Sequence, residues 1–291
     1  MQRSRLAAGA LMAGIALFSY FASREVNPVT GETQHIAISQ EQEIALGLQS
    51  APQMAAEFGG ADPDGSIQAD VESVGQRVVG GVSGKTPYRF RFVVLSDAKT
   101  VNAFALPGGP IFITRALLAS LENEAQLAGV LSHEAGHVIG RHSAEHLTKG
   151  QLTQGLVGAA GVAASNDQSS GQQAAQVAAV VGQMVQLKYG RSDELEADAL
   201  GVGLMADAGY DPRALVEVMA ILARSSGGSR QPEFLSSHPD PGNRQEKIRE
   251  AIAKRFPGGV PADLKLGQKI SVTADRGSSD LRATRPLVET R

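Results

Sequence analysis

The sequence predicts an α+β protein that is mainly helical and carries one small β-sheet. Most apolar residues recur at helical spacing, as Val71, Val74 and Val78 do, and these segments are bounded by caps and breakers. Strict alternation of side-chain character is confined to 88–94, which predicts one strand. Two further short strands are expected at 101–106 and 111–114, because a Pro-Gly-Gly-Pro turn separates them.

The helices are expected to follow one another along the chain. Ser39 and Gln42 form a capping box, which predicts a helix from residue 40. Further helices are expected at 67–78, 123–149, 193–208, 213–224 and 243–255. The stretch 155–182 is rich in Ala, Gly, Ser and Gln and predicts two small-residue helices around a loop at 166–171. A membrane hairpin is the weaker interpretation, because each apolar arm is too short to span a bilayer.

The N-terminus is typical of a targeting segment. Arg3 and Arg5 precede a run without charged residues at 6–22. Its length lies between a secretory signal and a short spanning helix, and the two arginines at the very start disfavour a buried core helix. Basic residues before the run predict an extracytoplasmic or periplasmic location for the rest of the chain, either soluble after cleavage or anchored to the inner membrane.

The chain is therefore divided into three parts. Residues 1–25 are expected to be a signal peptide or signal anchor, 26–257 the main domain, and 258–291 a polar C-terminal tail. The formal net charge of −3, the lack of Trp and the 4% of aromatic residues argue against a nucleic-acid partner. Cysteine is absent, which excludes disulfides, thiolate metal sites and a Cys nucleophile. Any metal ion must be held by the six His and by carboxylates.

Residues 133–137 read His-Glu-Ala-Gly-His and match the H-E-x-x-H pattern. His133 and His137 lie one turn apart on one helix face and reach a single ion, while Glu134 is placed to take a proton from a water that the ion acidifies. The alternative is a pair of surface His. The apolar helix around the motif favours the metal site, because burying His and Glu without partners is costly.

A catalytic zinc site with three protein ligands needs one more ligand, from another element. Glu194 and Asp198 share a helix face at i and i+4. We assign Glu194 to the metal and Asp198 to a hydrogen bond that orients a ligand imidazole. Taken alone, such a pair is more typical of a solvated acidic face.

His238 lies in a proline-framed loop at 236–241. It is a candidate for orienting the substrate, stabilising the tetrahedral oxyanion or occupying the open metal position, and an exposed loop His is an equally weighted alternative. His142 and His146 continue the motif helix at the wrong phase for the same ion, so structural roles are expected for both. His35 is assigned no role.

These motifs, in this order, resemble the M48 (Ste24-like) family of zinc metallopeptidases, and in particular its bacterial periplasmic branch. The chain after Arg255 is expected to be too short for the tetratricopeptide repeat domain found in that branch. The resemblance implies a zincin-like metallopeptidase domain at 26–257 with a small β-sheet whose edge strand lines the active-site cleft. The matching stretches are 27–31, 102–109, 133–141, 194–198 and 237–239, with Arg244.

The resemblance implies a role for each matching residue. His133, His137 and Glu194 would bind one Zn²⁺ ion per chain, with Glu134 as general base and Asp198 supporting a ligand His. His238 would be a mobile residue that caps the zinc, and Arg244 would lie near the active site. The stretch 155–182 is a plausible source of a lid. A polypeptide substrate would pair, as an added strand, with Asn102, Ala103, Phe104, Ala105 and Leu106.

The implied reaction is peptide-bond hydrolysis, with His238 or Arg244 stabilising the oxyanion. The implied substrates are misfolded or unassembled envelope proteins, and residues 6–22 would contact the membrane if uncleaved. A chaperone-like or adaptor protein with little proteolytic activity is one alternative, which the intact Glu134 disfavours. A zinc hydrolase of small amides or esters is another, which the strand at 102–106 disfavours because backbone pairing suits polypeptides. Prenyl-protein processing is not supported, because the polytopic membrane core of the eukaryotic Ste24 enzymes is absent.

Overall fold

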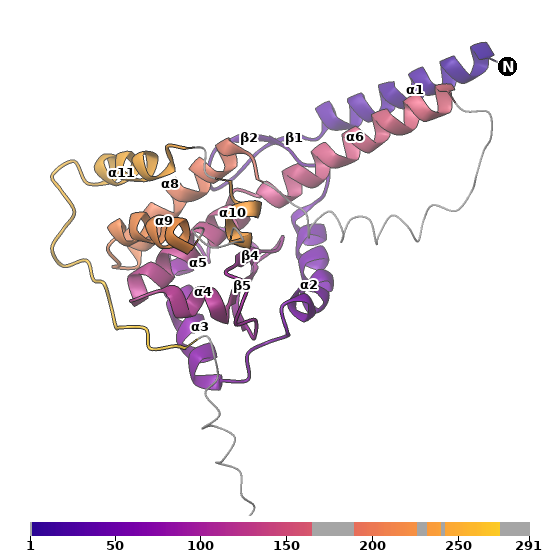
Figure 1. The fold of residues 1–291 in the computed structure, drawn as a ribbon. Coiled ribbons are helices and arrows are strands. Elements are labelled where there is room, and N and C mark those ends of the chain that lie inside the picture. The colour runs from indigo at the N-terminus through magenta and orange to yellow at the C-terminus, as the bar shows by residue number, and fades with distance from the viewer. Residues whose placement is uncertain (1, 165–188, 226–231, 240–241, 274–291) are drawn as a thin grey trace, which may run out of the picture.

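A computed structural model describes residues 2–164, 189–225, 232–239 and 242–273, and it confirms a mainly helical α+β fold (Figure 1). The elements in order are α1 (Gln2–Ala22), β1 (Arg24–Val26), β2 (Thr33–His35), α2 (Gln40–Glu57), α3 (Gly65–Val79), β3 (Arg91–Leu95), β4 (Ala103–Ala105), β5 (Pro110–Thr114), α4 (Arg115–Ser120), α5 (Glu124–Ile139), α6 (His142–Ala164), α8 (Arg191–Asp207), α9 (Arg213–Ser225), α10 (Glu233–Ser237) and α11 (Arg244–Arg255). The predicted capping box at Ser39 is present at the start of α2.

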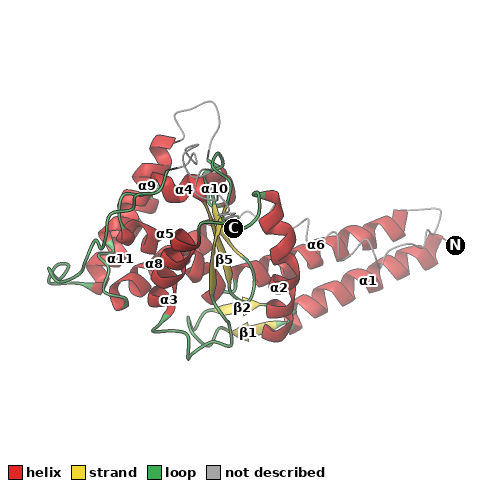
Figure 2. Ribbon diagram, turned by 90° about the horizontal axis from the view of Figure 1, so that it is seen from below, coloured by secondary structure: helices red, strands yellow, loops and turns green. Residues whose placement is uncertain are grey.

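Helix α5 lies at the centre of the fold, with α3, α8 and α9 packed around it (Figure 2). Its residues 125–139 are all buried, which explains the strongly apolar sequence around the H-E-x-x-H motif. Phe92 of β3 is fully buried against Gly75 of α3, where a Cβ would overlap its ring. The core therefore encloses the helix that carries the candidate metal ligands.

The main sheet has the strand order β3-β5-β4. Strand β3 runs parallel to β5, and β4 pairs antiparallel with β5 in the register Phe104 to Phe112. The expected tight turn joins β4 and β5, with Gly108 at φ 77° and Gly109 at φ 126°, a conformation that favours glycine. Strand β4 is thus an edge strand, whose other side has no strand partner among the described residues.

The predicted long helix over 123–149 is wrong in one respect, because it is interrupted after Ile139. Gly140 and Arg141 form a corner, and Arg141 has φ 57°, the left-handed region that only a few per cent of non-glycine residues adopt. The Nε of Arg141 donates to Glu43 Oε1 at 2.8 Å, and its guanidinium also pairs with Glu25. Contacts with residues about one hundred positions earlier therefore hold the corner.

The β1–β2 hairpin caps the same corner. Asn27 Nδ2 donates to the carbonyl of Ile139 at 2.8 Å, and Gln34 Nε2 donates to the carbonyl of Gly140. Carbonyls at the end of a helix lack partners within the helix, so these side chains satisfy two of them. The turn at 27–31, one of the stretches that carried the family resemblance, thus has a definite structural task.

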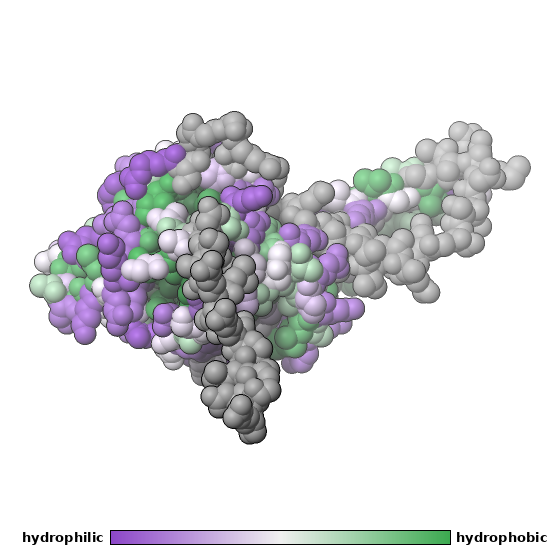
Figure 3. Space-filling model, turned by 60° about the horizontal axis from the view of Figure 1, so that its bottom comes forward, coloured by the Kyte–Doolittle hydropathy of each residue, from purple (hydrophilic) through white to green (hydrophobic). Residues whose placement is uncertain are grey.

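Helices α1 and α6 pack against each other and project from the body of the protein as an arm (Figure 1). Close approach depends on small residues: a Cβ on Gly9 would lie 2.7 Å from the carbonyl oxygen of Ala159. The stretch Arg3–Ala22 is long and apolar enough to cross a membrane by length and composition. Leu11 and Phe18 are exposed, and Figure 3 shows apolar surface on the arm. The expected helix pair at 155–182 begins in α6, but its part beyond Ala164 lies outside the described residues.

The polar tail does not leave the domain immediately after α11. Its described part, 258–273, runs back along the body, where the carbonyls of Leu266 and Gln268 accept the amides of Ala125 and Glu124 at 2.9 Å each. These bonds satisfy two free N–H groups at the start of α5. The tail therefore anchors the opposite end of the central helix, while residues 274–291 lie outside the described part of the chain.

Candidate metal centre

Three parts of the fold bring four candidate ligands together. His133 and His137 lie on α5, Glu194 lies near the start of α8, and His238 follows α10 directly. All four are buried, and each offers one ligand atom within 4.8 Å of the others. Helices α5 and α8 pack closely, which places Glu194 beside the two His as the spacing predicted.

The distances among these atoms describe one compact donor cluster. His133 Nε2 lies 3.1 Å from His137 Nε2 and 3.3 Å from His238 Nδ1. The carboxylate Oε1 of Glu194 lies 3.0 Å from His238 Nδ1 and 3.5 Å from His137 Nε2. Imidazole nitrogens with one carboxylate form a donor set that zinc accepts. The predicted set of three ligands is assembled, with His238 as a fourth donor.

The charge states of His137 and Glu194 also fit a divalent cation. Burial, reinforced by His133, holds the pKa of His137 well below its usual value, so this imidazole is neutral, the form that binds metal. Burial alone would raise the pKa of Glu194, but the nearby charges of His238, His133 and Arg244 outweigh it and lower the pKa. The site thus offers an ionised carboxylate beside neutral imidazole.

Glu134 differs from the ligands in its surroundings. Burial raises its pKa above the usual value, which makes the carboxylate a better proton acceptor near neutral pH. Both carboxylate oxygens are buried without a hydrogen-bond partner among the described residues, and His238 Nε2 lies 3.5 Å from Oε1. A buried carboxylate without partners is costly, and a water molecule on a bound cation would provide the missing partner.

Asp198 and Arg244 form a second layer behind the ligands. Asp198 Oδ1 lies 3.0 Å from His133 Nδ1, the contact predicted for a carboxylate that orients a ligand imidazole. Arg244 Nε donates to Asp198 Oδ2 at 2.6 Å, and another guanidinium nitrogen lies 2.9 Å from Glu194 Oε2. Arg244 is 1% exposed, so this network is almost free of solvent.

His142 has a closer relation to the site than the sequence indicated. On a continuous helix His142 would face away from the ligands. The corner at Gly140 instead directs its side chain toward them, and His142 Nδ1 lies 2.8 Å from His137 Nδ1. Its Nε2 lies 3.3 Å from Glu196 Oε2. A Cβ at Gly140 would overlap the His142 ring. The helix-breaking signal that Gly140 gives after the motif was the clue available in the sequence.

Tyr189 is a second residue that sequence reasoning missed. Its ring stacks on His137 with centroids 3.9 Å apart, and its hydroxyl lies 2.9 Å from Ser143 Oγ. Of the other His, His146 bonds Asp193 at 2.6 Å and His35 stacks on Tyr20 at 4.4 Å, and neither is among the clustered donors. The ring of Tyr189 therefore covers one ligand and excludes water from it.

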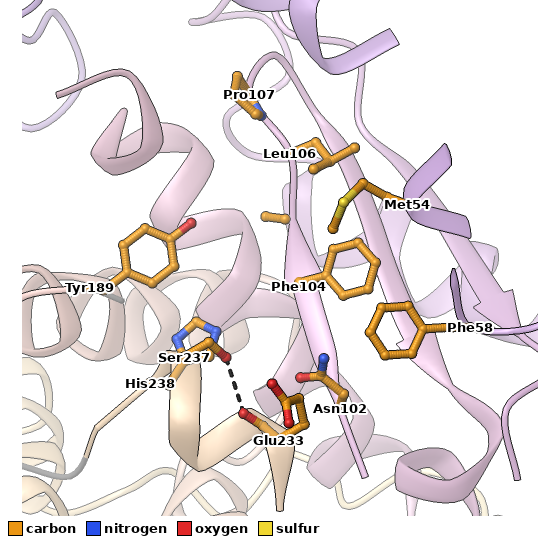
Figure 4. Close-up of a pocket in the computed structure, with 11 residues that line it drawn as sticks. Met54, Phe58, Asn102, Phe104, Leu106, Pro107, Tyr189, Glu233, Ser237 and His238 are labelled. Carbon is orange, nitrogen blue, oxygen red and sulfur yellow. Dashed lines mark hydrogen bonds between the residues drawn. The ribbon is translucent and has the colours of Figure 1, made fainter. Parts of the chain in front are cut away.

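A cavity opens beside His238, with β4 along its floor (Figure 4). Of the residues expected to bind substrate, Asn102, Phe104, Ala105 and Leu106 line it, whereas Ala103 is fully buried. Arg244 is absent from the lining. The other lining residues are Met54, Phe58, Pro107, Tyr189, Glu233, Ser237 and His238.

The contact between α5 and α8 gives a test of how tightly the site is built. A Cβ on Gly136 would lie 2.8 Å from the carbonyl oxygen of Ala197 and 3.0 Å from its Cα, so Gly136→Ala must push α8 and its Glu194 away. We expect a loss of about 1–3 kcal/mol of stability, with weaker zinc binding. Gly203→Ala, on the open side of α8, is the control and is expected to be neutral or stabilising. Urea unfolding measures the stability of the two variants, and zinc titration measures their zinc affinity. Equal stability and equal zinc affinity in the two variants would contradict a tight contact at Gly136.

Comparison with known proteins agrees with this geometry. The model of Peptidase family M48 matches residues 66–252. The beta-barrel assembly-enhancing protease of Yersinia pestis is 30% identical over 264 residues, which cover 87% of this chain and 53% of that protein. The protein of the same name from Escherichia coli K12 is 32% identical over 64% of this chain and 39% of its own length. The mitochondrial metalloendopeptidase OMA1 of Schizosaccharomyces pombe is 31% identical over 83% of this chain and 70% of its own.

The chain thus spans about half or less of the length of the bacterial relatives named here. The family match covers well over half of this chain and includes the helices that carry His133, His137 and Glu194, together with His238. The chain belongs to peptidase family M48.

Proposed function

We propose that this protein is a zinc-dependent endopeptidase with a zincin-like domain at 26–257, preceded by a signal or anchor at 1–25 and followed by the tail at 258–291. The observation that carries the proposal is the position of the donor cluster. His133, His137 and Glu194 converge beside a cleft that Asn102, Phe104, Ala105 and Leu106 line, at the edge strand β4. An edge strand accepts an extended polypeptide through backbone hydrogen bonds, which a small amide or ester cannot exploit.

In this mechanism each residue has a separate task. A zinc ion held by His133, His137 and Glu194 would supply a Lewis acid for the scissile carbonyl and make water acidic enough to deprotonate near neutral pH. Glu134 takes the proton from the attacking water and passes it to the leaving amine, which its raised pKa favours. Strand β4 holds the peptide extended, and Tyr189 keeps solvent from His137.

We assign stabilisation of the oxyanion to His238 rather than to Arg244. His238 lines the cleft and lies within reach of both Glu134 and Glu194, so its ring faces the position of the reacting carbonyl. The guanidinium of Arg244 is engaged by Asp198 and Glu194 on the far side of the ligands. Its task is to hold these two carboxylates in place.

The proposed substrates are misfolded or unassembled proteins of the cell envelope. Two observations support this location and class. The Arg3–Ala22 helix suits export or anchoring, and relatives at 30–32% identity carry the name beta-barrel assembly-enhancing protease. The free edge of β4 makes no demand on substrate sequence through backbone pairing, which suits unfolded chains of many sequences.

The proposal is tested first by zinc content and casein cleavage. Purified protein is expected to hold one zinc per chain and to cleave casein. Removal of zinc by a chelator should abolish cleavage, and readdition should restore it. Folded protein, judged by circular dichroism, that takes up no zinc would overturn the ligand assignment. Zinc without cleavage would favour the alternative of a chaperone-like protein on a peptidase fold.

His238 decides between that alternative and a latent enzyme. His238 would be a fourth protein donor to a zinc ion, in place of water or substrate, so the resting enzyme is expected to be slow. His238→Ala should change casein cleavage while zinc content stays near one per chain. Loss of zinc from this variant would instead make His238 an essential ligand. His35→Ala, which alters a His far from the cluster, is the control.

A further inference from the structure

The cavity beside His238 has two walls of different character (Figure 4). Tyr189, Ser237 and His238 form the wall next to the candidate metal ligands. Across β4, Met54 and Phe58 come from α2 and its C-cap, with the ring of Phe104 beside them. The second wall has no charged side chain and serves no purpose in the hydrolysis itself.

The backbone of β4 determines where a bound peptide would lie. Asn102 and Leu106 form backbone hydrogen bonds with β5. The amide of Thr114 donates to the Asn102 carbonyl at 2.9 Å, and the amide of Leu106 donates to the Pro110 carbonyl at 2.8 Å. Backbone groups alternate in direction along a strand, so those of Ala103 and Ala105 point to the free edge. A substrate strand would therefore pair with Ala103 and Ala105, and because these are 0% and 8% exposed, the neighbouring elements must move aside to admit it.

This register puts one substrate side chain on the face that carries Phe104. Residues directly opposite each other in paired strands project to the same face, and neighbours along a strand project to opposite faces. The substrate residue across from Phe104 thus points toward Phe58 and Met54, and the residues before and after it point to the other face. For a substrate strand antiparallel to β4, the pair at Phe104 is the closer, non-hydrogen-bonded kind, because Ala103 and Ala105 make the edge bonds.

The chemistry of this face is apolar and aromatic. The Phe104 ring stacks on Phe112 with centroids 4.9 Å apart and lies 5.3 Å from that of Phe58. Phe58 and Phe104 are only partly buried, whereas Met54 and Phe112 beneath them are 5% and 3% exposed. A partly exposed aromatic surface beside a buried apolar cluster is stabilised when an apolar side chain packs over it.

We propose that Phe58, Phe104 and Met54 form a side-chain subsite that selects a large apolar residue, such as Leu, Met or Phe, in the substrate. The inference rests on the proposed endopeptidase function and narrows its substrate class. Large apolar residues are mostly buried in folded proteins. The subsite therefore directs cleavage to chains that expose such residues, while the edge bonds of Ala103 and Ala105 accept any backbone.

The test uses zinc-loaded full-length protein and fluorogenic peptides. Cleavage sites in casein, mapped by mass spectrometry, identify the position with the strongest apolar preference. Two peptides that differ only there, Leu against Ser, are then compared by kcat/KM. We expect the Leu peptide to be favoured roughly 10- to 100-fold, the effect of burying one large aliphatic side chain.

Variants of Phe58 tie that preference to the subsite. Phe58→Ala should reduce the Leu-to-Ser ratio of kcat/KM several-fold. Phe58→Lys should raise cleavage of a matching Glu peptide, a gain that misfolding cannot produce. Leu48→Ala, an exposed position on the same helix, should change neither ratio.

Two outcomes would overturn the inference, and they are distinguishable. In the first, the protein cleaves casein and peptides, but it shows no apolar preference, or Phe58→Ala and Phe58→Lys leave the Leu-to-Ser ratio of kcat/KM unchanged. This result rejects the subsite and retains the endopeptidase function. In the second, folded and zinc-loaded protein cleaves no substrate at all. This result rejects the proposed function and, with it, the subsite.

Discussion

Glu134→Gln is expected to lower the kcat for casein or peptide cleavage by about 10²- to 10⁴-fold, the usual contribution of a general base. The amide keeps the size of the carboxylate but cannot accept the proton of the attacking water. Zinc content should stay near one per chain, because Glu134 is not among the four clustered donors. The measurement is kcat with zinc quantified on the same sample.

The stability of this variant separates chemistry from folding. Both Glu134 oxygens are buried without a hydrogen-bond partner among the described residues, and burial raises the pKa of the carboxyl, so the charged form destabilises the folded chain. Glu134→Gln should therefore unfold at the same or a higher urea concentration than wild type. Glu145→Gln, a partly exposed position on α6 that pairs with Lys149, is the matched control for loss of a carboxylate. Full activity of Glu134→Gln would remove Glu134 from the mechanism.

Arg244→Met is expected to produce the largest loss of stability, about 3–5 kcal/mol in the absence of zinc. The substitution leaves Glu194 and Asp198 as buried carboxylates without their shared guanidinium, and removal of one partner from a buried ion pair has a cost of this size. Urea unfolding in the presence of a chelator measures it. With zinc bound the loss should be smaller, because the cation compensates the charge of Glu194.

The same variant tests the positioning role of Arg244. Zinc affinity is expected to fall roughly 10- to 100-fold, as it does when partners of metal ligands are removed. Arg249→Met, an exposed position on the same helix, should alter stability by less than about 0.5 kcal/mol. If Arg244→Met matches Arg249→Met in both stability and zinc affinity, the buried network behind the ligands has no role.

The sequence predicted those parts of the site that depend on local spacing. His133, Glu134 and His137 are arranged by a single helix, and Glu194 and Asp198 by another, so the i, i+4 rule was sufficient for each group. The meeting of the two groups was predictable from zinc chemistry, which demands a third ligand. The strand pair at 101–106 and 111–114 was likewise predictable, because its turn requires glycine at positive φ.

The features that escaped prediction depend on contacts between distant residues. The left-handed Arg141 is stabilised by Glu43 and Glu25, and no local signal forces an arginine into that conformation. In a continuous helix His142 would lie on a different face from His137. The contact between the two rings was therefore not predictable from a continuous helix. Position 189 carried no motif, and Tyr189 reaches His137 only through the tertiary fold.

The capped corner between α5 and α6 restricts where the N-terminal helix can be removed. Asn27 and Gln34 hold the last carbonyls of α5, and the corner they hold places His142 against His137. A processing peptidase that cuts before Asn27 releases α1 and Glu25, but it leaves Asn27, Gln34 and Glu43 to hold the end of the metal-binding helix. A cut after Gln34 releases both side chains and loosens the ring of one candidate ligand. A cut that spares the metal site and a cut that loosens it are thus separated by only a few residues of chain.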